Sequence, residues 1–122
     1  AFIRDYDRCL RDGDVPLHHI CSELGPGCLE AALSVRPLPA AADDAALFKL
    51  YTKAHAIGHG LLASFMAQLS DQHPGLGGHP IVSLRDCQSG AAVFDDGQGG
   101  LSTQGRQFVA GVLHALPELM PM

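Results

Sequence analysis

The sequence predicts an all-α fold, a small helical bundle built around one long central helix at about residues 44–70. Apolar residues recur at helical spacing through most of the chain, and glycine and proline runs separate the periodic segments. No segment alternates apolar and polar residues over more than a few positions, as a half-buried strand would. Because 122 residues is the size of one ordinary domain, we predict a single helical domain over residues 1–122.

Three short helices are predicted before the central one. Residues 2–11 place apolar side chains at helical spacing, and Gly13 ends this pattern. Asp14 suits the start of a second short helix, which the Gly-Pro-Gly run at 25–27 ends. A third short helix is predicted over residues 28–33.

The central helix and the segments after it are predicted from capping residues and breaks. Asp43 and Asp44 can cap the central helix, and residues 71–82 form the main loop because glycine, proline and histidine dominate them. Ser83 opens a segment that resembles a capped helix reaching about Phe94. Ser102 can cap a last helix, which Pro117 is expected to end.

Charge and hydropathy exclude several classes of partner. The formal net charge is −5, and the eight lysines and arginines form no basic cluster, so we expect no nucleic-acid partner. No apolar run approaches the roughly 20 residues that a membrane-spanning helix needs, so no membrane span is expected.

The four cysteines, Cys9, Cys21, Cys28 and Cys87, form no CxxC pair of the zinc-ribbon kind. They are either buried thiols or disulfide partners, and the sequence leaves both alternatives open. If this soluble chain is exported, we expect at least one disulfide, because oxidising compartments convert thiols that meet in a small fold.

Two histidines, His55 and His59, lie four residues apart on the predicted central helix. This spacing places both rings on one face, one turn apart, so that their nitrogens can converge on one ion. Phe48, Leu62 and Met66 fall on the same stripe, and both rings are therefore expected to be desolvated. A buried imidazole needs a partner at each nitrogen, and a metal supplies one. We predict a small helical metal-binding protein whose cofactor is zinc or another transition metal.

The run from Lys53 to Gly60 resembles the HExxH helix of the zincin-type metallopeptidases. In that family two histidines bind zinc and the glutamate between them is the general base. Ala56 stands where the family has glutamate, and a methyl group cannot accept a proton from zinc-bound water. The resemblance therefore implies an inactivated metallopeptidase helix, as an alternative to a dedicated metal-binding protein.

A metal ion needs at least one further protein ligand. His18 and His114 are the first candidates, because neighbouring helices can deliver either of them to the histidine pair. No general base is identifiable, so no enzymatic activity is assigned.

Two further alternatives use the same histidines differently. One is a haem-binding or haem-sensing bundle, with a second axial ligand such as His114 from another helix. Attachment of haem through a CxxCH motif is excluded, because the chain has no such motif. The other is a structural or interaction module in which the histidines are core residues.

Overall fold

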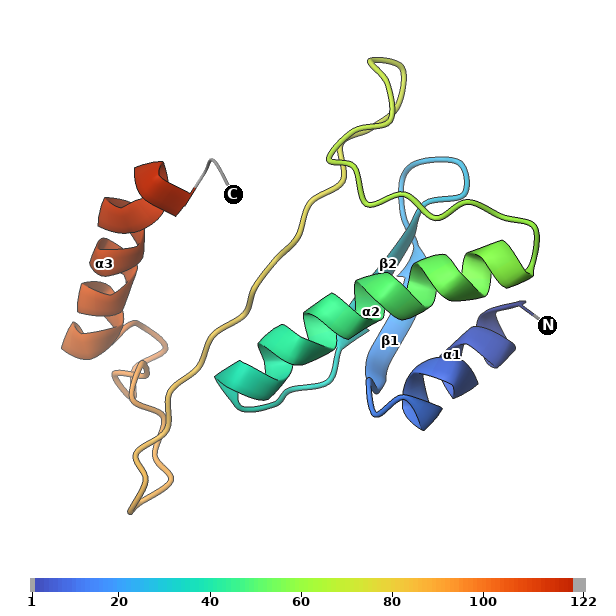
Figure 1. The fold of residues 1–122 in the computed structure, drawn as a ribbon. Helices are drawn as coiled ribbons and strands as arrows, with labels where there is room; N and C mark the ends of the chain where they lie inside the picture. Colours follow the sequence, from blue (N-terminus) through green and yellow to red (C-terminus); the bar gives the residue numbers. More distant parts are fainter. Residues whose placement is uncertain (1, 120–122) are drawn as a thin grey trace. The chain divides into compact units, whose positions relative to one another are not determined.

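A computed structural model describes residues 2–119, and its architecture mixes helices with a small sheet (Figure 1). The elements follow the order α1 (Phe2–Asp12), β1 (Leu17–Ser22), β2 (Leu29–Leu33), α2 (Leu38–Gly58) and α3 (Thr103–Leu119). The predicted all-α bundle is therefore wrong, because β1 and β2 form a two-stranded antiparallel sheet.

Contacts between residues divide the chain into two compact units, Ala1–Gly77 and Gly78–Met122. The first unit holds the sheet with α1 and α2, and the second holds α3 with the loops that precede it. The single domain over residues 1–122 stays a prediction. No helix among residues 2–119 combines the length and apolar character that a membrane crossing requires.

The β1–β2 hairpin replaces the two short helices predicted at these positions. Its turn contains the Gly-Pro-Gly run, and Gly27 adopts a left-handed φ of 73° that favours glycine. In the hairpin register Ile20 faces Ala31 and Cys21 faces Glu30, with an irregularity between Leu17 and His19. The prediction of helices was wrong because each strand is stabilised by a partner strand across the turn. The spacing of apolar residues within one segment does not indicate such a partner.

The core of the first unit lies where α1, α2 and the hairpin meet. Its most buried side chains are Tyr6, Leu10, Val15 and Leu17, of which Leu10 and Val15 are fully buried. The partly buried side chains around them are Ile20, Ala31, Leu33, Leu47, Phe48 and Tyr51. Because Ile20 and Ala31 belong to this set, one face of the hairpin turns toward the core and the alternate residues turn away from it.

Helix α2 begins and ends earlier than the predicted helix at residues 44–70. Pro39 lies in its first turn, where a missing N–H carries no penalty. His59 is the C-cap, and Gly60 follows with a left-handed φ of 70°, a common way for a helix to end. Residues 61–69 therefore leave the helix, although Phe65 still contacts the Phe48 ring, with 5.8 Å between ring centroids.

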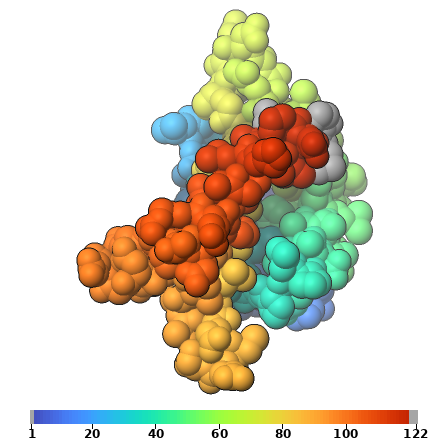
Figure 2. Space-filling view, turned by 90° about the vertical axis from the view of Figure 1, so that its left-hand side faces the viewer, coloured from blue at the N-terminus to red at the C-terminus, as the bar shows by residue number. Residues whose placement is uncertain are grey.

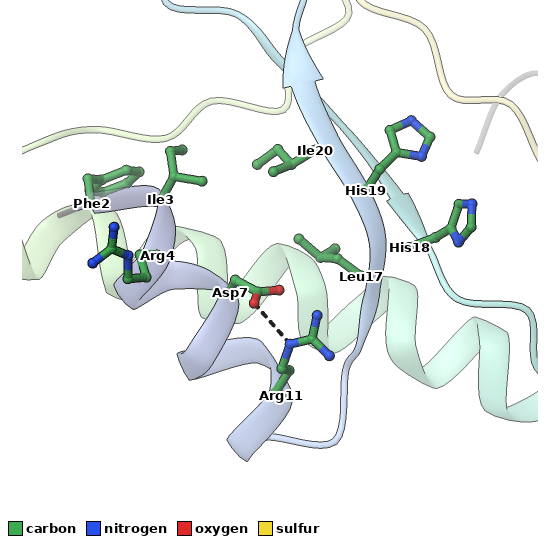
Figure 3. Close-up of a pocket in the computed structure, with 9 residues that line it drawn as sticks. All are labelled: Phe2, Ile3, Arg4, Asp7, Arg11, Leu17, His18, His19 and Ile20. Carbon is green, nitrogen blue, oxygen red and sulfur yellow. Dashed lines mark hydrogen bonds and ion pairs between the residues drawn. The ribbon is translucent and has the colours of Figure 1, made fainter.

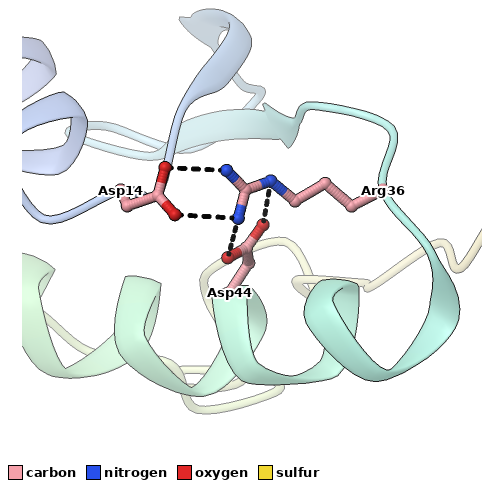
Figure 4. Close-up of polar contacts among 3 residues, drawn as sticks. All are labelled: Asp14, Arg36 and Asp44. Atoms are coloured by element: carbon pink, nitrogen blue, oxygen red, sulfur yellow. Dashed lines mark hydrogen bonds and ion pairs between the residues drawn. The ribbon is translucent and has the colours of Figure 1, made fainter.

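Asp44 lies inside α2 rather than at its start, and its buried carboxylate faces Arg36 (Figure 4). Arg36 Nε lies 3.4 Å from Asp44 Oδ2, and Nη2 of the same guanidinium lies 2.8 Å from Asp14 Oδ1. Arg36 therefore connects the turn after α1 to the first half of α2. Its hydrogen bonds and charge lower the pKa of the Asp14 carboxyl below its ordinary value.

The second unit begins with loops instead of the helix predicted from Ser83 to Phe94. The carboxylate of Asp86 accepts hydrogen bonds from the backbone N–H of Gln88 and of Ser89, which closes a turn. These hydrogen bonds lower the pKa of Asp86, with the Ser89 N–H as the largest cause. The local turn therefore competes successfully with the helix that the capping pattern suggested.

Helix α3 begins as predicted and ends later. The Ser102 hydroxyl accepts a hydrogen bond from the Gly105 N–H at 3.0 Å, so the predicted cap is confirmed. Pro117 lies inside the helix and does not end it. Figure 2 draws α3 in orange and red. Its exposed apolar side chains are Phe108, Val109, Val112, Leu113, Leu116 and Leu119.

Candidate functional site

The predicted histidine pair comes together at the C-terminal end of α2. The rings of His55 and His59 lie 4.3 Å apart between centroids. Phe2 of α1 packs against both, at 4.9 Å from His55 and 5.1 Å from His59, and Tyr6 lies 5.3 Å from His55. The two histidine rings therefore form the α2 side of an aromatic contact between α1 and α2.

Hydrogen bonding at this pair is partly internal to the helix. His59 Nδ1 donates to the backbone carbonyl of His55 at 2.9 Å, which satisfies a carbonyl of the last turn. His55 Nε2 is buried and has no hydrogen-bond partner among the described residues. The two rings thus share a face as predicted, but one of them serves as a helix cap.

The remaining predicted ligands, His18 and His114, lie on other elements of the chain. Among residues 2–119, no three side chains of His, Cys, Asp or Glu come close enough to hold an ion. His18 lies on β1, where its ring stacks edge-on against His19 at 5.5 Å. His114 lies on α3 of the second unit, and its placement beside the histidine pair stays a prediction.

An open groove of about 660 Å³ separates α1 from β1 (Figure 3). Ile3, Leu17 and Ile20 line it with apolar surface, and Arg11 Nε is paired with Asp7 Oδ2 at 2.9 Å along its rim. The rings of His18 and His19 are drawn at the far side of β1 from α1. Arg4, His18 and His19 also line the groove, so its polar lining is mainly basic, and Asp7, its one acidic residue, is paired with Arg11.

The second polar feature of the first unit is the hairpin face that turns away from the core. We define the outer hairpin face by Cys21, Glu23, Cys28 and Glu30. Cys21 and Glu30 are directly paired, and the Glu23 N–H donates to the Cys28 carbonyl at 3.0 Å. Directly opposed residues of antiparallel strands project to the same side, and residues two apart along a strand share a side. All four side chains therefore lie on one face, opposite Ile20.

The turn that joins the two strands holds this face in register. The Cys28 N–H donates to the Gly25 carbonyl at 2.9 Å, and the Glu23 carboxylate accepts from the Leu24 N–H at 3.0 Å. Gly25 is buried, and a Cβ added to it would lie 2.4 Å from Cys28 Sγ and 3.3 Å from Pro74 Cγ. Only glycine therefore fits this position without displacing the Cys28 thiol.

Sequence reasoning did not single out Glu23 and Glu30, although a signal for them exists. They lie seven residues apart on either side of the Gly-Pro-Gly run. A tight turn between two carboxylates predicts that they become cross-strand neighbours, and this was missed because both flanks were interpreted as helices.

Comparisons with known proteins show the family to which this chain belongs. Residues 1–122 match the family model of the glutamine synthetase catalytic domain. The chain belongs to this glutamine synthetase family. No solved structure matches it.

Curated relatives agree with this assignment. The chain is 38% identical over 109 residues to type-1 glutamine synthetase 2 of Dictyostelium discoideum, covering 88% of this chain and 21% of the relative. It is 37% identical over 112 residues to a glutamate–isopropylamine ligase of Pseudomonas, covering 90% of this chain and 24% of the relative. It is 27% identical over 121 residues to gamma-glutamylputrescine synthetase of Escherichia coli, covering 98% of this chain and 25% of the relative. The chain thus spans about a fifth to a quarter of the length of these relatives.

The family assignment corrects the functional prediction. A small helical metal-binding protein is wrong, and so are its alternatives of a haem bundle, an inactivated metallopeptidase helix and a structural module. The prediction of a metal cofactor agrees with the family, because the glutamine synthetase family uses divalent ions such as magnesium or manganese. The comparisons do not support zinc or haem. The expected absence of a nucleic-acid partner stays a prediction. All four cysteines are free thiols in the structure.

Proposed function

We propose that this chain is part of the catalytic domain of a ligase that joins the carboxyl group of glutamate to an amine. The match of the whole chain to the glutamine synthetase catalytic domain carries this proposal. The names of its relatives share one product type, an amide of glutamate, and differ in whether the amine is isopropylamine, putrescine or the nitrogen of glutamine. The relatives therefore share the type of reaction, and experiment must identify the amine that this protein uses.

The divalent ion of the family is best matched by carboxylates. Magnesium and manganese are hard cations that prefer carboxylate oxygen to imidazole or thiol. The outer hairpin face presents Glu23 and Glu30 on one side, and both are exposed. His55, in contrast, is enclosed by aromatic rings, and His59 caps its helix. We therefore propose Glu23 and Glu30 as ligands.

Two carboxylates are only part of a metal site. No third ligand joins them among residues 2–119, and the relatives are several times longer than this chain. In this proposal the remaining ligands come from other parts of the complete catalytic domain. The ion would supply positive charge to the oxygen atoms that become negative during amide formation. The hairpin's own contribution is to hold two carboxylates at a constant separation through its register and its tight turn.

The activity can be tested in the complete protein that carries this chain. Amide formation from a carboxylate and an amine is uphill in water, so ATP is included as an energy source together with magnesium or manganese. Glutamate is offered with ammonia, isopropylamine or putrescine, and the glutamyl amide is detected by mass spectrometry. We expect a product with at least one amine. The absence of product with all three would contradict the proposal.

The metal ligands are tested separately by substitution. Glu30→Gln keeps the size of the side chain and removes its charge, so it should weaken manganese binding at least about tenfold, as loss of a ligand or its support typically does. Asp12→Asn is the matched control, because Asp12 is an exposed carboxylate at the end of α1 and away from the hairpin face. Equal manganese affinity in Glu30→Gln and in the unchanged protein would contradict the assignment of the ligands.

A further inference from the structure

Among residues 2–119, one buried side-chain nitrogen has no hydrogen-bond partner, and it is Nε2 of His55. Phe2 and Tyr6 of α1 pack against this ring, with 4.9 Å and 5.3 Å between ring centroids. The Tyr6 hydroxyl is hydrogen-bonded to the Thr52 hydroxyl and not to the His55 nitrogen. We assign the proton of the neutral His55 ring to Nδ1, because a lone pair at Nε2 leaves no buried donor without an acceptor.

The titratable groups near the His55 ring come from the two helices that contact it. Asp5, Tyr6 and Cys9 lie on one side of α1 at helical spacing, and His59 follows on α2 with its ring 4.3 Å away. In the described part of the chain, none of these groups forms an ion pair with the His55 ring or a hydrogen bond with its Nε2. His59 is exposed and uses Nδ1 to donate to the His55 carbonyl, so a second proton can be placed on its Nε2. His55 is therefore the ring for which a second proton finds no acceptor.

We propose that His55 makes the contact between α1 and α2 sensitive to acid. Free histidine takes up its second proton at about pH 6.5. In the docked helices this proton would be placed on the buried Nε2, where a charged donor without an acceptor is unfavourable. The protonated ring is therefore favoured only when α1 moves away and water reaches Nε2. The contact is complete above about pH 6.5 and weakens as the pH falls below this value, because the separated helices bind the proton and the docked helices do not.

The neighbouring histidine acts in the same direction. In acid His59 also becomes a cation, and two like charges repel each other across the 4.3 Å between the ring centroids. Loosening of α1 reaches the hairpin, because Leu10 of α1 and Leu17 of β1 belong to one core. The sensitivity to acid is therefore a regulatory property of the first unit, and it does not depend on the metal ligands proposed above.

Hydrogen exchange of the complete protein tests this proposal, with each rate corrected for the intrinsic pH dependence of exchange. If the docked ring stays neutral, the opening equilibrium of α1 rises about tenfold between about pH 7.5 and about pH 5.5. We therefore expect the peptide that covers residues 2–12 to lose protection by about tenfold over this range. His55→Phe keeps an aromatic ring of similar size and removes the titrating nitrogen, so its protection should stay constant. His18→Phe is the matched control, because His18 is an exposed histidine on β1, and it should respond as the unchanged protein does.

A second variant covers the case in which His55→Phe does not fold. Phe2→Ala removes the α1 ring that packs against both histidines, so water reaches Nε2 and the pH dependence should be smaller than in the unchanged protein. If the variant that folds loses as much protection in acid as the unchanged protein, another group is responsible and the proposal is overturned. Protection of residues 2–12 that stays constant or rises in acid in the unchanged protein overturns it as well, because the docked ring then accepts the proton in place, against the faces of the aromatic rings.

Discussion

Replacing Gly25 with alanine tests whether the turn sets the geometry of the outer hairpin face. The added Cβ would lie 2.4 Å from Cys28 Sγ and 3.3 Å from Pro74 Cγ. Favourable contacts between heavy atoms begin near 3.5 Å, so the added Cβ and Cys28 Sγ would overlap by about 1.1 Å. Gly25 is not among the residues with a positive φ, so the substitution introduces crowding and no backbone strain.

The magnitude follows from how far the crowded atoms can move. Overpacking a buried site typically costs about 1–3 kcal/mol. The Cys28 sulfur is one bond from Cβ and packs under the turn, so it can escape only by rotating χ1 or by shifting the strand. We expect Gly25→Ala to reduce the free energy of unfolding of the hairpin by about 2 kcal/mol.

A second substitution identifies the cause. Cys28→Ala removes the sulfur and leaves the backbone hydrogen bonds of the turn in place, so the double variant Gly25→Ala/Cys28→Ala should recover most of the lost stability. Neighbouring substitutions that share a contact couple by about 0.5–3 kcal/mol, and here the coupling should be favourable. Hydrogen exchange of peptides that cover residues 17–33 measures the local stability. An unchanged exchange rate in Gly25→Ala, or no recovery in the double variant, would refute this account of the turn.

Two further predictions concern charged groups. Arg36→Met should lower the denaturant midpoint more than Asp14→Asn does, because Asp44 is buried and loses its cation whereas Asp14 is exposed; equal midpoints would contradict this. Backbone N–H donors lower the pKa of Asp86 and of Asp96 below 3.8 in the folded loops. Since the folded pKa lies below the unfolded one, the stabilisation is complete above pH 3.8 and is lost as the pH falls through the folded pKa. Hydrogen exchange of residues 84–101 should accelerate only in that acidic range relative to its intrinsic rate, and constant protection there would refute the prediction.

The two terminal helices could be predicted from the sequence because local signals determine them. Helix α1 covers Phe2–Asp12 and is followed by Gly13, close to the predicted range of residues 2–11. The Ser102 cap is a contact between residues three apart and is therefore visible in a short window. These are cases in which the backbone hydrogen bonds close within the segment itself.

The hairpin could not be predicted in the same way. Leu17, Ile20 and Cys21 lie at spacings that fit one face of a helix, and β2 contains alanine and glutamate, which favour helices. The strands form because Ile20 and Ala31 reach the core together once the turn has paired them. The free energy gained by this burial depends on both strands together with α1 and α2. The residues next to either strand in the sequence therefore do not reveal it.

The same distinction explains why the sequence predicted a site at the histidines and none at the carboxylates of the hairpin. On a helix, spacing alone identifies neighbours, so His55 and His59 were correctly expected to lie together, and their rings are 4.3 Å apart. Proximity does not reveal what the rings do, because a helix that stops at Gly58 makes His59 a cap for the carbonyl of His55. Across a hairpin, neighbours depend on register, and Glu23 and Glu30 share a face only through the turn between them. Locating this polar face therefore required the strand pairing, which the spacing of residues along the chain did not reveal.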